Sequence, residues 1–150
     1  MKISYTSIGI IHSPFKELSG MPIQPSSESS ASGHLEIYPE FTEGLKDIDG
    51  FSHIYLIYHL HKVRQPKLTV TPFLDTTPRG LFATRAPRRP NPIGLSLVKL
   101  ARIQGNLVYI ENIDILDQTP LLDIKPYIPE FEDAEKIRIG WLEKNKSEVA

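Results

Sequence analysis

Four charged side chains lie within an otherwise apolar stretch near the end of the sequence. Asp114, Asp117, Asp123 and Lys125 are interleaved with isoleucine and leucine between residues 113 and 129. A carboxylate in such surroundings normally needs a partner, and Asp123 and Lys125 would share one face of a strand. One interpretation is a structural ion pair followed by turn chemistry at Asp117, and the other is a ligand pocket at the strand end. The residues alone leave both open.

A second group of chemically active side chains occupies the proline-rich stretch from Phe82 to Leu97, which carries Arg85, Arg88 and Arg89. Proline lacks the amide hydrogen and biases its predecessor toward extended geometry, so the stretch predicts a rigid loop between two strands. Guanidinium groups fixed on such a loop suit recognition of phosphate, carboxylate or a base edge, although a stiff surface loop with solvated arginines is the alternative. The apolar residues at its ends are expected to be buried: Phe82, Ile93, Leu95 and Leu97.

The histidines offer a weaker signal. His59 and His61 are two residues apart and would share a face of a strand. With His53 or Asp117 they would complete a three-ligand metal site, but no third ligand stands at a recognisable spacing. We therefore predict no bound metal, and we assign His61 and Lys62 to the polar rim of a pocket for an organic ligand.

Composition narrows the function classes further. The chain has 150 residues, a formal net charge of -1 and no cysteine. Disulfides, cysteine-ligated metal and a thiol nucleophile are excluded, and nucleic-acid binding would need a local basic patch. The sequence contains neither a Gly-x-Gly-x-x-Gly nor a Walker motif, and no apolar run long enough for a membrane span. We expect a soluble cytoplasmic protein.

The elements that must position these residues are mostly short strands. Strands are expected over residues 5–12, 34–38, 51–60, 67–72, 96–103, 107–115 and 121–128. The run 51–60 is the most hydrophobic, which predicts a central strand buried on both faces. Residues 39–48 have the spacing of a short amphipathic helix, and Gln104-Gly105-Asn106 suits a hairpin loop.

This pattern predicts a mainly β fold, a small antiparallel barrel or sandwich with few short helices. We expect one domain over residues 1–150, with a core over 1–131 and a tail over 132–150 that fits either a strand or a short helix. The long connection at 20–33 is largely small and polar. Within it Pro22, Ile23 and Gln24 are stiffened by prolines, as in a lid or binding loop.

Four motifs in register resemble the TsaA-like family of tRNA N6-threonylcarbamoyladenosine methyltransferases. They are Asp49-Gly-Phe-Ser-His-Ile54, Phe82-Ala-Thr-Arg85, Arg89-Pro-Asn-Pro-Ile-Gly-Leu-Ser-Leu97 and Asp117-Gln-Thr-Pro-Leu-Leu-Asp-Ile-Lys-Pro-Tyr-Ile-Pro129. The resemblance begins at Ile8 and covers nearly the whole chain. It implies a small β-barrel that binds S-adenosylmethionine, usually forms a homodimer, and methylates N6 of the modified adenosine beside the tRNA anticodon.

The resemblance also implies a set of site residues. For the methyl donor these are Pro22, Ile23, Gln24, His61, Lys62, Arg85, Leu97, Asp117, Gln118, Thr119 and Pro120. Family members often carry arginine at the position of Ile23, and the best-known bacterial members have an additional C-terminal domain. The donor site therefore follows more directly from the resemblance than the tRNA substrate.

Methyl transfer from a sulfonium is an in-line displacement that depends on alignment and exclusion of water, and it needs no cysteine, metal or activated serine. We expect Arg88 and Arg89 to contact RNA, and we take Asp123 and Lys125 as candidate groups near the acceptor nitrogen. Two alternatives stay open. One is a non-catalytic S-adenosylmethionine-binding module, and the other is a metal hydrolase that uses His59 and His61.

Overall fold

The computed structural model describes residues 1–17, 31–132 and 135–145. By its internal contacts the chain divides into two compact units. The first combines Met1–Val63 with Asn91–Tyr127, and the second combines Arg64–Pro90 with Ile128–Ala150. The expectation that residues 1–131 share one domain core stays a prediction.

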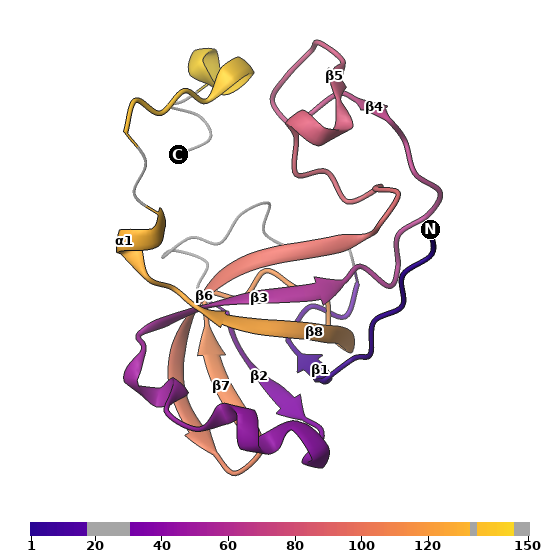
Figure 1. The fold of residues 1–150 in the computed structure, drawn as a ribbon. Coiled ribbons are helices and arrows are strands. Elements are labelled where there is room, and N and C mark those ends of the chain that lie inside the picture. Colours follow the sequence, from indigo (N-terminus) through magenta and orange to yellow (C-terminus); the bar gives the residue numbers. More distant parts are fainter. Residues whose placement is uncertain (18–30, 133–134, 146–150) are drawn as a thin grey trace. The chain divides into compact units, whose positions relative to one another are not determined.

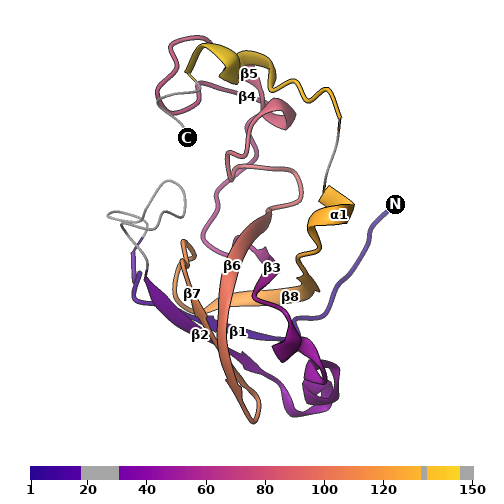
Figure 2. The same ribbon diagram turned by 90° about the vertical axis from the view of Figure 1, so that its left-hand side faces the viewer.

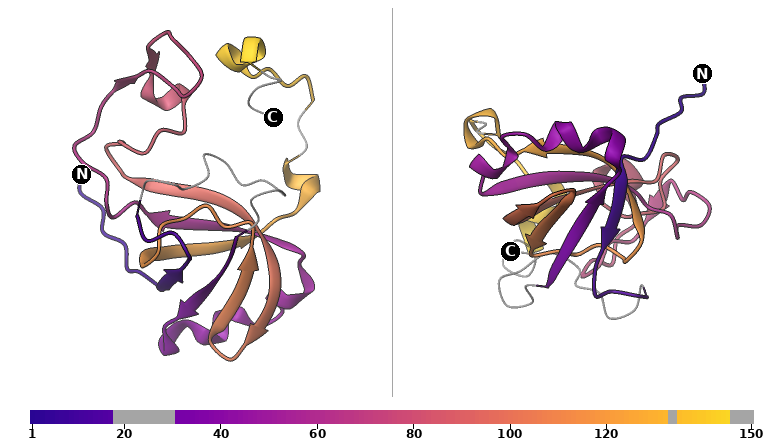
Figure 3. Two further views of the ribbon diagram at one scale, coloured as in Figure 1. Left: turned by 180° about the vertical axis from the view of Figure 1, so that it is seen from behind. Right: turned by 90° about the horizontal axis from the view of Figure 1, so that it is seen from below.

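The first unit is a closed antiparallel barrel (Figure 1). Its strands are β1 (Gly9–His12), β2 (Ser32–Ile37), β3 (His53–His59), β6 (Ile93–Gln104), β7 (Leu107–Glu111) and β8 (Thr119–Pro126). They are hydrogen-bonded in the order β1-β2-β7-β6-β3-β8, and Figure 3 shows from below how they surround a common interior. The predicted mainly β fold and small antiparallel barrel are confirmed.

The barrel interior is filled by aliphatic side chains from alternate strand positions. Fully buried examples are Ile11, Leu35, Ile54, Leu56, Val98, Val108 and Leu121. Because successive strand residues point to opposite faces, this alternation lets each strand contribute to one continuous core. Leu45 and Ile48 pack against the core from outside the strands.

Two burial predictions are wrong. In β3 only Ile54, Leu56 and Tyr58 are buried, whereas the intervening residues are half-buried. The strand was expected to be covered on both faces, but a strand in a closed barrel has only one inner face.

The apolar residues of the proline-rich stretch are likewise not buried. The exposed fractions are 75% for Phe82, 39% for Ile93 and 51% for Leu95, and Leu97 is half-buried. For Ile93, Leu95 and Leu97 the reason lies in the register of β6, because Ser96, Val98 and Leu100 take its inner face. Figure 2 shows the long, curved course of β6 along the barrel wall.

The predicted helix over residues 39–48 is replaced by two 3₁₀ helices, η1 (Pro39–Leu45) and η2 (Ile48–Gly50). Asp47 separates them with a φ of 68°, a left-handed conformation that interrupts the helical path. The hairpin at Gln104-Gly105-Asn106 is confirmed, since it joins β6 to β7 and Gly105 has a φ of 63°.

The second unit contains the short hairpin of β4 (Thr69–Val70) and β5 (Arg79–Gly80), with η3 (Leu81–Ala83), α1 (Pro129–Glu132) and η4 (Gly140–Asn145). Asp75 accepts hydrogen bonds from the amides of Thr76 and Thr77 and pairs with Arg79 at 3.0 Å. The indole of Trp141 donates to the carbonyl of Ala83 at 2.8 Å. The C-terminal segment therefore stabilises the segment that precedes Pro90.

Within the described residues, no helix has the length and apolar character needed to cross a membrane.

Candidate functional site

Several sequence-distant segments meet at one end of the barrel. β1 ends at His12 where β8 begins, since Ile11 pairs with Thr119. The amide of Leu60, just after β3, donates to the carbonyl of Pro92, just before β6. Antiparallel pairing thus gathers the segment after β1, the segment after β3 and the connection from β7 to β8 at this end, which we call the barrel mouth.

Asp117 is the most strongly held side chain at the barrel mouth. One carboxylate oxygen accepts from the backbone amide of Ser13 at 2.8 Å, and the other accepts from Lys16 at 2.7 Å. Backbone hydrogen bonds from Asp117 to Phe15 and from Gln118 to Ile11 fix the same turn. The turn predicted at Asp117 is therefore attached to the end of β1.

The electrostatics of Asp117 follow from these contacts. Burial alone would raise its pKa, but the hydrogen bonds from Lys16 and from the Ser13 amide outweigh that effect and hold the pKa of Asp117 below its ordinary value. The carboxylate is charged near neutral pH. A charged carboxylate can accept up to about four hydrogen bonds, so it retains capacity for a cationic or hydroxyl-bearing ligand.

Thr119 and His61 form the other side of the turn. The Thr119 hydroxyl donates to the carbonyl of Leu116 at 2.6 Å and lies 3.4 Å from Nδ1 of His61. Burial, followed by the nearby charge of Lys62, lowers the pKa of His61. The His61 imidazole that faces the turn is therefore neutral at neutral pH. Of the predicted donor-site residues, the structure brings together His61, Asp117, Gln118 and Thr119.

Sequence reasoning missed Ser13 and Lys16, the two residues that hold Asp117. They lie 104 and 101 positions before it in the chain. His12 was also missed, although its ring accepts from the Gln118 amide at 3.1 Å. Only the pairing of β1 with β8 brings these residues together, and no local motif encodes that pairing.

The other predicted donor-site residues take no part in the contacts described above. Leu97 is on β6 opposite Tyr55, on the side of the strand that faces away from the core. Pro120 is half-buried next to Thr119, and Lys62 is exposed. Arg85 is exposed and belongs to the second unit. Pro22, Ile23 and Gln24 lie outside the described residues.

Arg88 and Arg89, the predicted RNA contacts, belong to the second unit and donate hydrogen bonds to its backbone carbonyls. Arg88 donates through Nε to the carbonyl of Gln65 at 2.9 Å. Arg89 donates to the carbonyls of Thr84 and Ala86 at 3.0 and 2.9 Å. These contacts attach both side chains to backbone carbonyls of the same unit, and their role toward RNA stays a prediction.

Asp123 and Lys125 form the predicted ion pair, with 3.2 Å between Oδ2 and Nζ. Their side chains are 51% and 66% exposed. Asp123 lies four positions after Thr119 on β8, which is roughly 13 Å along a strand. The pair is therefore not part of the barrel mouth as described, and its assignment to the acceptor nitrogen stays a prediction.

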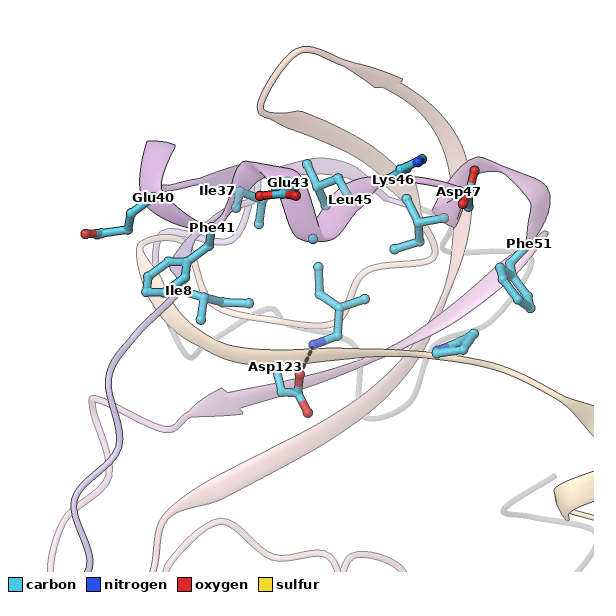
Figure 4. A pocket seen from close by; sticks show the side chains of 14 residues that line it. Ile8, Ile37, Glu40, Phe41, Glu43, Leu45, Lys46, Asp47, Phe51 and Asp123 are labelled. Carbon is cyan, nitrogen blue, oxygen red and sulfur yellow. Dashed lines mark hydrogen bonds between the residues drawn. The ribbon is translucent and has the colours of Figure 1, made fainter.

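Asp123 instead lines a separate hollow of about 700 Å³ beneath η1 and η2 (Figure 4). Its apolar surface includes Ile8, Phe41 and Phe51, and Glu40, Glu43 and Asp47 belong to its lining. In the close-up, Glu40 points away from the hollow. Because most of its charged groups are carboxylates, this hollow disfavours a polyanion such as RNA.

A metal centre finds no support in the part of the chain that the structure describes. No group of three His, Cys, Asp or Glu residues there could hold a metal ion. The hypothesis of a hydrolase built on His59 and His61 thus has no third ligand among these residues.

Comparison with known proteins places the chain in a family. Residues 10–133 match the family described as tRNA-methyltransferase O N-terminal domain. The chain belongs to this family. The predicted TsaA-like resemblance is thereby confirmed.

Individual relatives agree with the family assignment. The chain is 57% identical over 145 residues to a probable S-adenosyl-L-methionine-binding protein of Pyrococcus abyssi, covering 97% of this chain and 79% of that protein. It is 34% identical to the tRNA (adenine(37)-N6)-methyltransferase of Mus musculus, covering 88% of this chain and 32% of that protein.

Solved structures show the same fold. The crystal structure of TrmO from Pseudomonas aeruginosa superposes with a TM-score of 0.79 at 37% identity, covering 93% of this chain and 62% of that one. This chain therefore spans most of the archaeal relative but less than two thirds of the solved bacterial protein.

Proposed function

We propose that this protein is an S-adenosylmethionine-dependent methyltransferase that methylates N6 of threonylcarbamoyladenosine in tRNA. The observation that carries the proposal is the family match over residues 10–133. The relatives from mouse and rat are tRNA (adenine(37)-N6)-methyltransferases, and several others are S-adenosyl-L-methionine-binding proteins.

The residues at the barrel mouth fit the cofactor. When bound, S-adenosylmethionine supplies a methyl group on a positively charged sulfur, together with an ammonium group and ribose hydroxyls. The ionised Asp117 is able to accept hydrogen bonds from the ammonium group or a hydroxyl, and its attachment to Ser13 and Lys16 fixes its position. Because the His61 ring is neutral at pH 7, it does not repel a sulfonium.

Residues 64–90 carry charge suited to tRNA. Residues 64–90 contain six of the 17 lysines and arginines but only one of the 18 acidic residues. Such a local excess attracts a phosphate backbone although the whole chain carries a net charge of -1. Arg85, Arg88 and Arg89 are the proposed contacts.

A methyl-transfer assay tests the proposal. Purified protein is incubated with S-adenosylmethionine labelled in its methyl group and with tRNA that carries the threonylcarbamoyl modification. The same tRNA species without the modification is the control. We expect label in the modified tRNA only, and absence of label from both would refute the substrate assignment.

A non-catalytic binding module is the second candidate, because several archaeal relatives are described as S-adenosyl-L-methionine-binding proteins. It predicts saturable binding of the cofactor by calorimetry without label in any tRNA. The two assays together separate the candidates.

We further infer that the protein is a homodimer, as the family resemblance implies. Ile93 and Leu95 on β6 expose 39% and 51% of their surface, an apolar pair that a second copy would cover. Light scattering should give twice the chain mass of 17.0 kDa for the wild type. For Leu95→Glu it should give the mass of one chain. A monomeric wild type would contradict the inference.

A further inference from the structure

A line of hydrogen bonds leads from the outer face of the barrel to the predicted cofactor site at the barrel mouth. Nε2 of His12, at the end of β1, lies 3.0 Å from Oε1 of Glu36 on β2. Nδ1 of the same ring lies 3.1 Å from Nε2 of Gln118, and this amide nitrogen lies 3.4 Å from Oδ2 of Asp117. Neither His12 nor Glu36 belongs to the predicted cofactor site.

The chemistry of these groups gives each hydrogen bond one direction. An ionised carboxylate only accepts, so Nε2 of His12 donates to Glu36. In a neutral imidazole the other ring nitrogen is then an acceptor, and the amide nitrogen of Gln118 donates to it. The second hydrogen of this amide nitrogen is donated to Asp117. Glu36 thereby selects the tautomer of His12, and the tautomer decides which end of the Gln118 amide faces the ring.

Stacking holds the His12 ring in its plane. His12 and His34 are directly opposite in the pairing of β1 with β2, and their ring centroids are 4.5 Å apart with planes 18° from parallel. The His34 ring is in turn tilted against Tyr109 on β7 at 5.7 Å. Burial, followed by the nearby His12, lowers the pKa of His34, so His34 is neutral at neutral pH and does not repel its neighbour. The His12 ring therefore presents Nδ1 from a fixed position.

The backbone holds Gln118 in an uncommon conformation. Its φ is 67°, in the left-handed region that residues with long side chains rarely adopt. A backbone hydrogen bond of 2.8 Å from the Gln118 amide to the carbonyl of Ile11 keeps the residue beside the end of β1. Such conformations persist where the surrounding structure imposes them, and they cluster at functional sites. Gln118 is thus held by β1 through both its backbone and its side chain.

The side-chain amide of Gln118 has one group left for a ligand. Both of its hydrogens are donated, to His12 and to Asp117, whereas its carbonyl oxygen accepts no hydrogen bond from any residue that the structure describes. Gln118 is exposed, so this oxygen is accessible. Beside the Asp117 carboxylate it completes a pair of acceptors. Such a pair suits a ligand with several N–H or O–H groups, such as an ammonium group or a ribose diol.

We propose that His12 and Glu36 are positioning residues of the cofactor site, which hold the Gln118 amide with its carbonyl oxygen turned to the cofactor. The inference rests on the proposed binding of S-adenosylmethionine at the barrel mouth. Without the acceptor on His12, the amide is free to rotate by 180° and present its N–H groups instead. Those groups repel an ammonium group, and the acceptor that a hydroxyl uses is lost. Neither His12 nor Glu36 touches the cofactor, and no covalent step is involved.

Two substitutions of His12 separate its hydrogen bond from its packing. His12→Phe keeps a ring against His34 but has no acceptor, so it should weaken S-adenosylmethionine binding about 2- to 10-fold, the usual contribution of one neutral hydrogen bond. His12→Asn loses the ring, but its side-chain carbonyl is able to take the place of Nδ1, so the affinity should stay within about 2-fold of the wild type. Calorimetry at one pH measures both. A purely structural role of the ring predicts the reverse order.

A double-mutant cycle shows whether His12 acts through Gln118. Gln118→Ala alone should weaken S-adenosylmethionine binding to a similar degree as His12→Phe. In the Gln118→Ala background, His12→Phe should then change the affinity by less than about 2-fold, because the amide that His12 orients is absent. Full additivity of the two effects would overturn the proposal.

Glu36→Leu tests the selection of the tautomer. Without this carboxylate, Nδ1 of His12 carries the proton in part of the molecules, so cofactor affinity should fall, though less than in His12→Phe. Glu111→Leu is the matched control, because it removes a carboxylate of β7 that pairs with Lys99 at 3.8 Å instead of with His12. It should bind the cofactor as the wild type does. Wild-type affinity in Glu36→Leu, or an equal loss in Glu111→Leu, would overturn the role of Glu36.

Failure of this inference and failure of the proposed function are distinguishable. If the wild type binds S-adenosylmethionine, then unchanged affinity in His12→Phe, or weaker binding by His12→Asn than by His12→Phe, would overturn the positioning role alone. A wild type that does not bind S-adenosylmethionine would refute the proposed function. If His12→Phe does not fold, as judged by circular dichroism, Glu36→Leu combined with Gln118→Ala gives the same cycle.

Discussion

The two units carry their polar groups in contrasting ways. In the barrel, Asp117 and Thr119 are largely buried and tied to the backbone of neighbouring segments. In the second unit, residues 64–90 gather six basic side chains, several of them exposed. Fixed, buried groups suit a small cofactor whose orientation matters, whereas exposed positive charge suits a long polyanion. Binding of cofactor and binding of tRNA should therefore respond to different mutations.

The largest difference between the effect on cofactor affinity and the effect on tRNA affinity is expected from Asp117→Ala. Loss of a hydrogen bond to a charged group costs about 1.5–3 kcal/mol, which corresponds to roughly 10- to 150-fold weaker cofactor binding. Calorimetry with S-adenosylmethionine measures this, and tRNA affinity without cofactor should be unchanged. Normal cofactor affinity in this variant would show that the turn is only structural.

Arg88→Ala is expected to have a smaller effect, and to weaken the binding of tRNA and not that of the cofactor. Removal of one phosphate contact should weaken tRNA binding several-fold and reduce the slope of log affinity against log salt by about 0.7–0.9. Cofactor affinity should stay at the wild-type value. Lys46→Ala, a basic residue between η1 and η2, is the control and should alter neither. An unchanged salt slope in Arg88→Ala would remove this arginine from the RNA surface.

Asp117 and Asp114, both in the barrel, should affect the pH dependence of folding stability in opposite ways. The folded pKa of Asp117 is lowered, so its contribution to stability is present above the unfolded value of about 3.9 and is lost as pH falls through the folded pKa. The folded pKa of Asp114 is raised, so ionisation of Asp114 reduces stability as pH rises from the unfolded value through the folded pKa.

Urea unfolding between about pH 3 and pH 6 measures both effects. Relative to wild type, Asp117→Asn should become more destabilised as pH rises, and Asp114→Asn should become less destabilised or gain stability. Equal pH slopes for the two variants would contradict the opposite pKa shifts.

The smallest effect is expected from Lys125→Gln. The ion pair with Asp123 is more than half exposed, and exposed pairs contribute less than about 1 kcal/mol. Thermal unfolding should show a minor change, and methyl transfer should proceed at the wild-type rate. A loss of activity with normal stability would restore Lys125 as a group that acts on the acceptor.

The sequence predicted the fold class and the turn at Asp117 correctly. The apolar run of β3 and the alternating apolar residues of β8 are local signals, and the turn at Asp117 follows from its own residues. Burial of Ile93 and Leu95 was predicted wrongly because barrel closure, and not hydrophobicity, decides which face of β6 is inside.

The partners of Asp117 and Asp114 could not be predicted for a related reason. Ser13 and Lys16 come from the far end of the chain, and Ser96 meets Asp114 only through barrel closure. Such contacts depend on register, which a single sequence specifies only through the sum of all strand pairings.

The hydrogen bond from Trp141 to Ala83 has a consequence for biosynthesis. These residues are 58 positions apart, and the guanidinium of Arg79 also lies over the Trp141 ring at 5.6 Å. During translation the hairpin of β4 and β5 leaves the ribosome well before its tryptophan partner. By the time Trp141 emerges, all the barrel strands, which end before Tyr127, have already been synthesised and can pair. The second unit therefore completes its folding last, and substitution of Trp141 should delay the final step of maturation without slowing formation of the barrel.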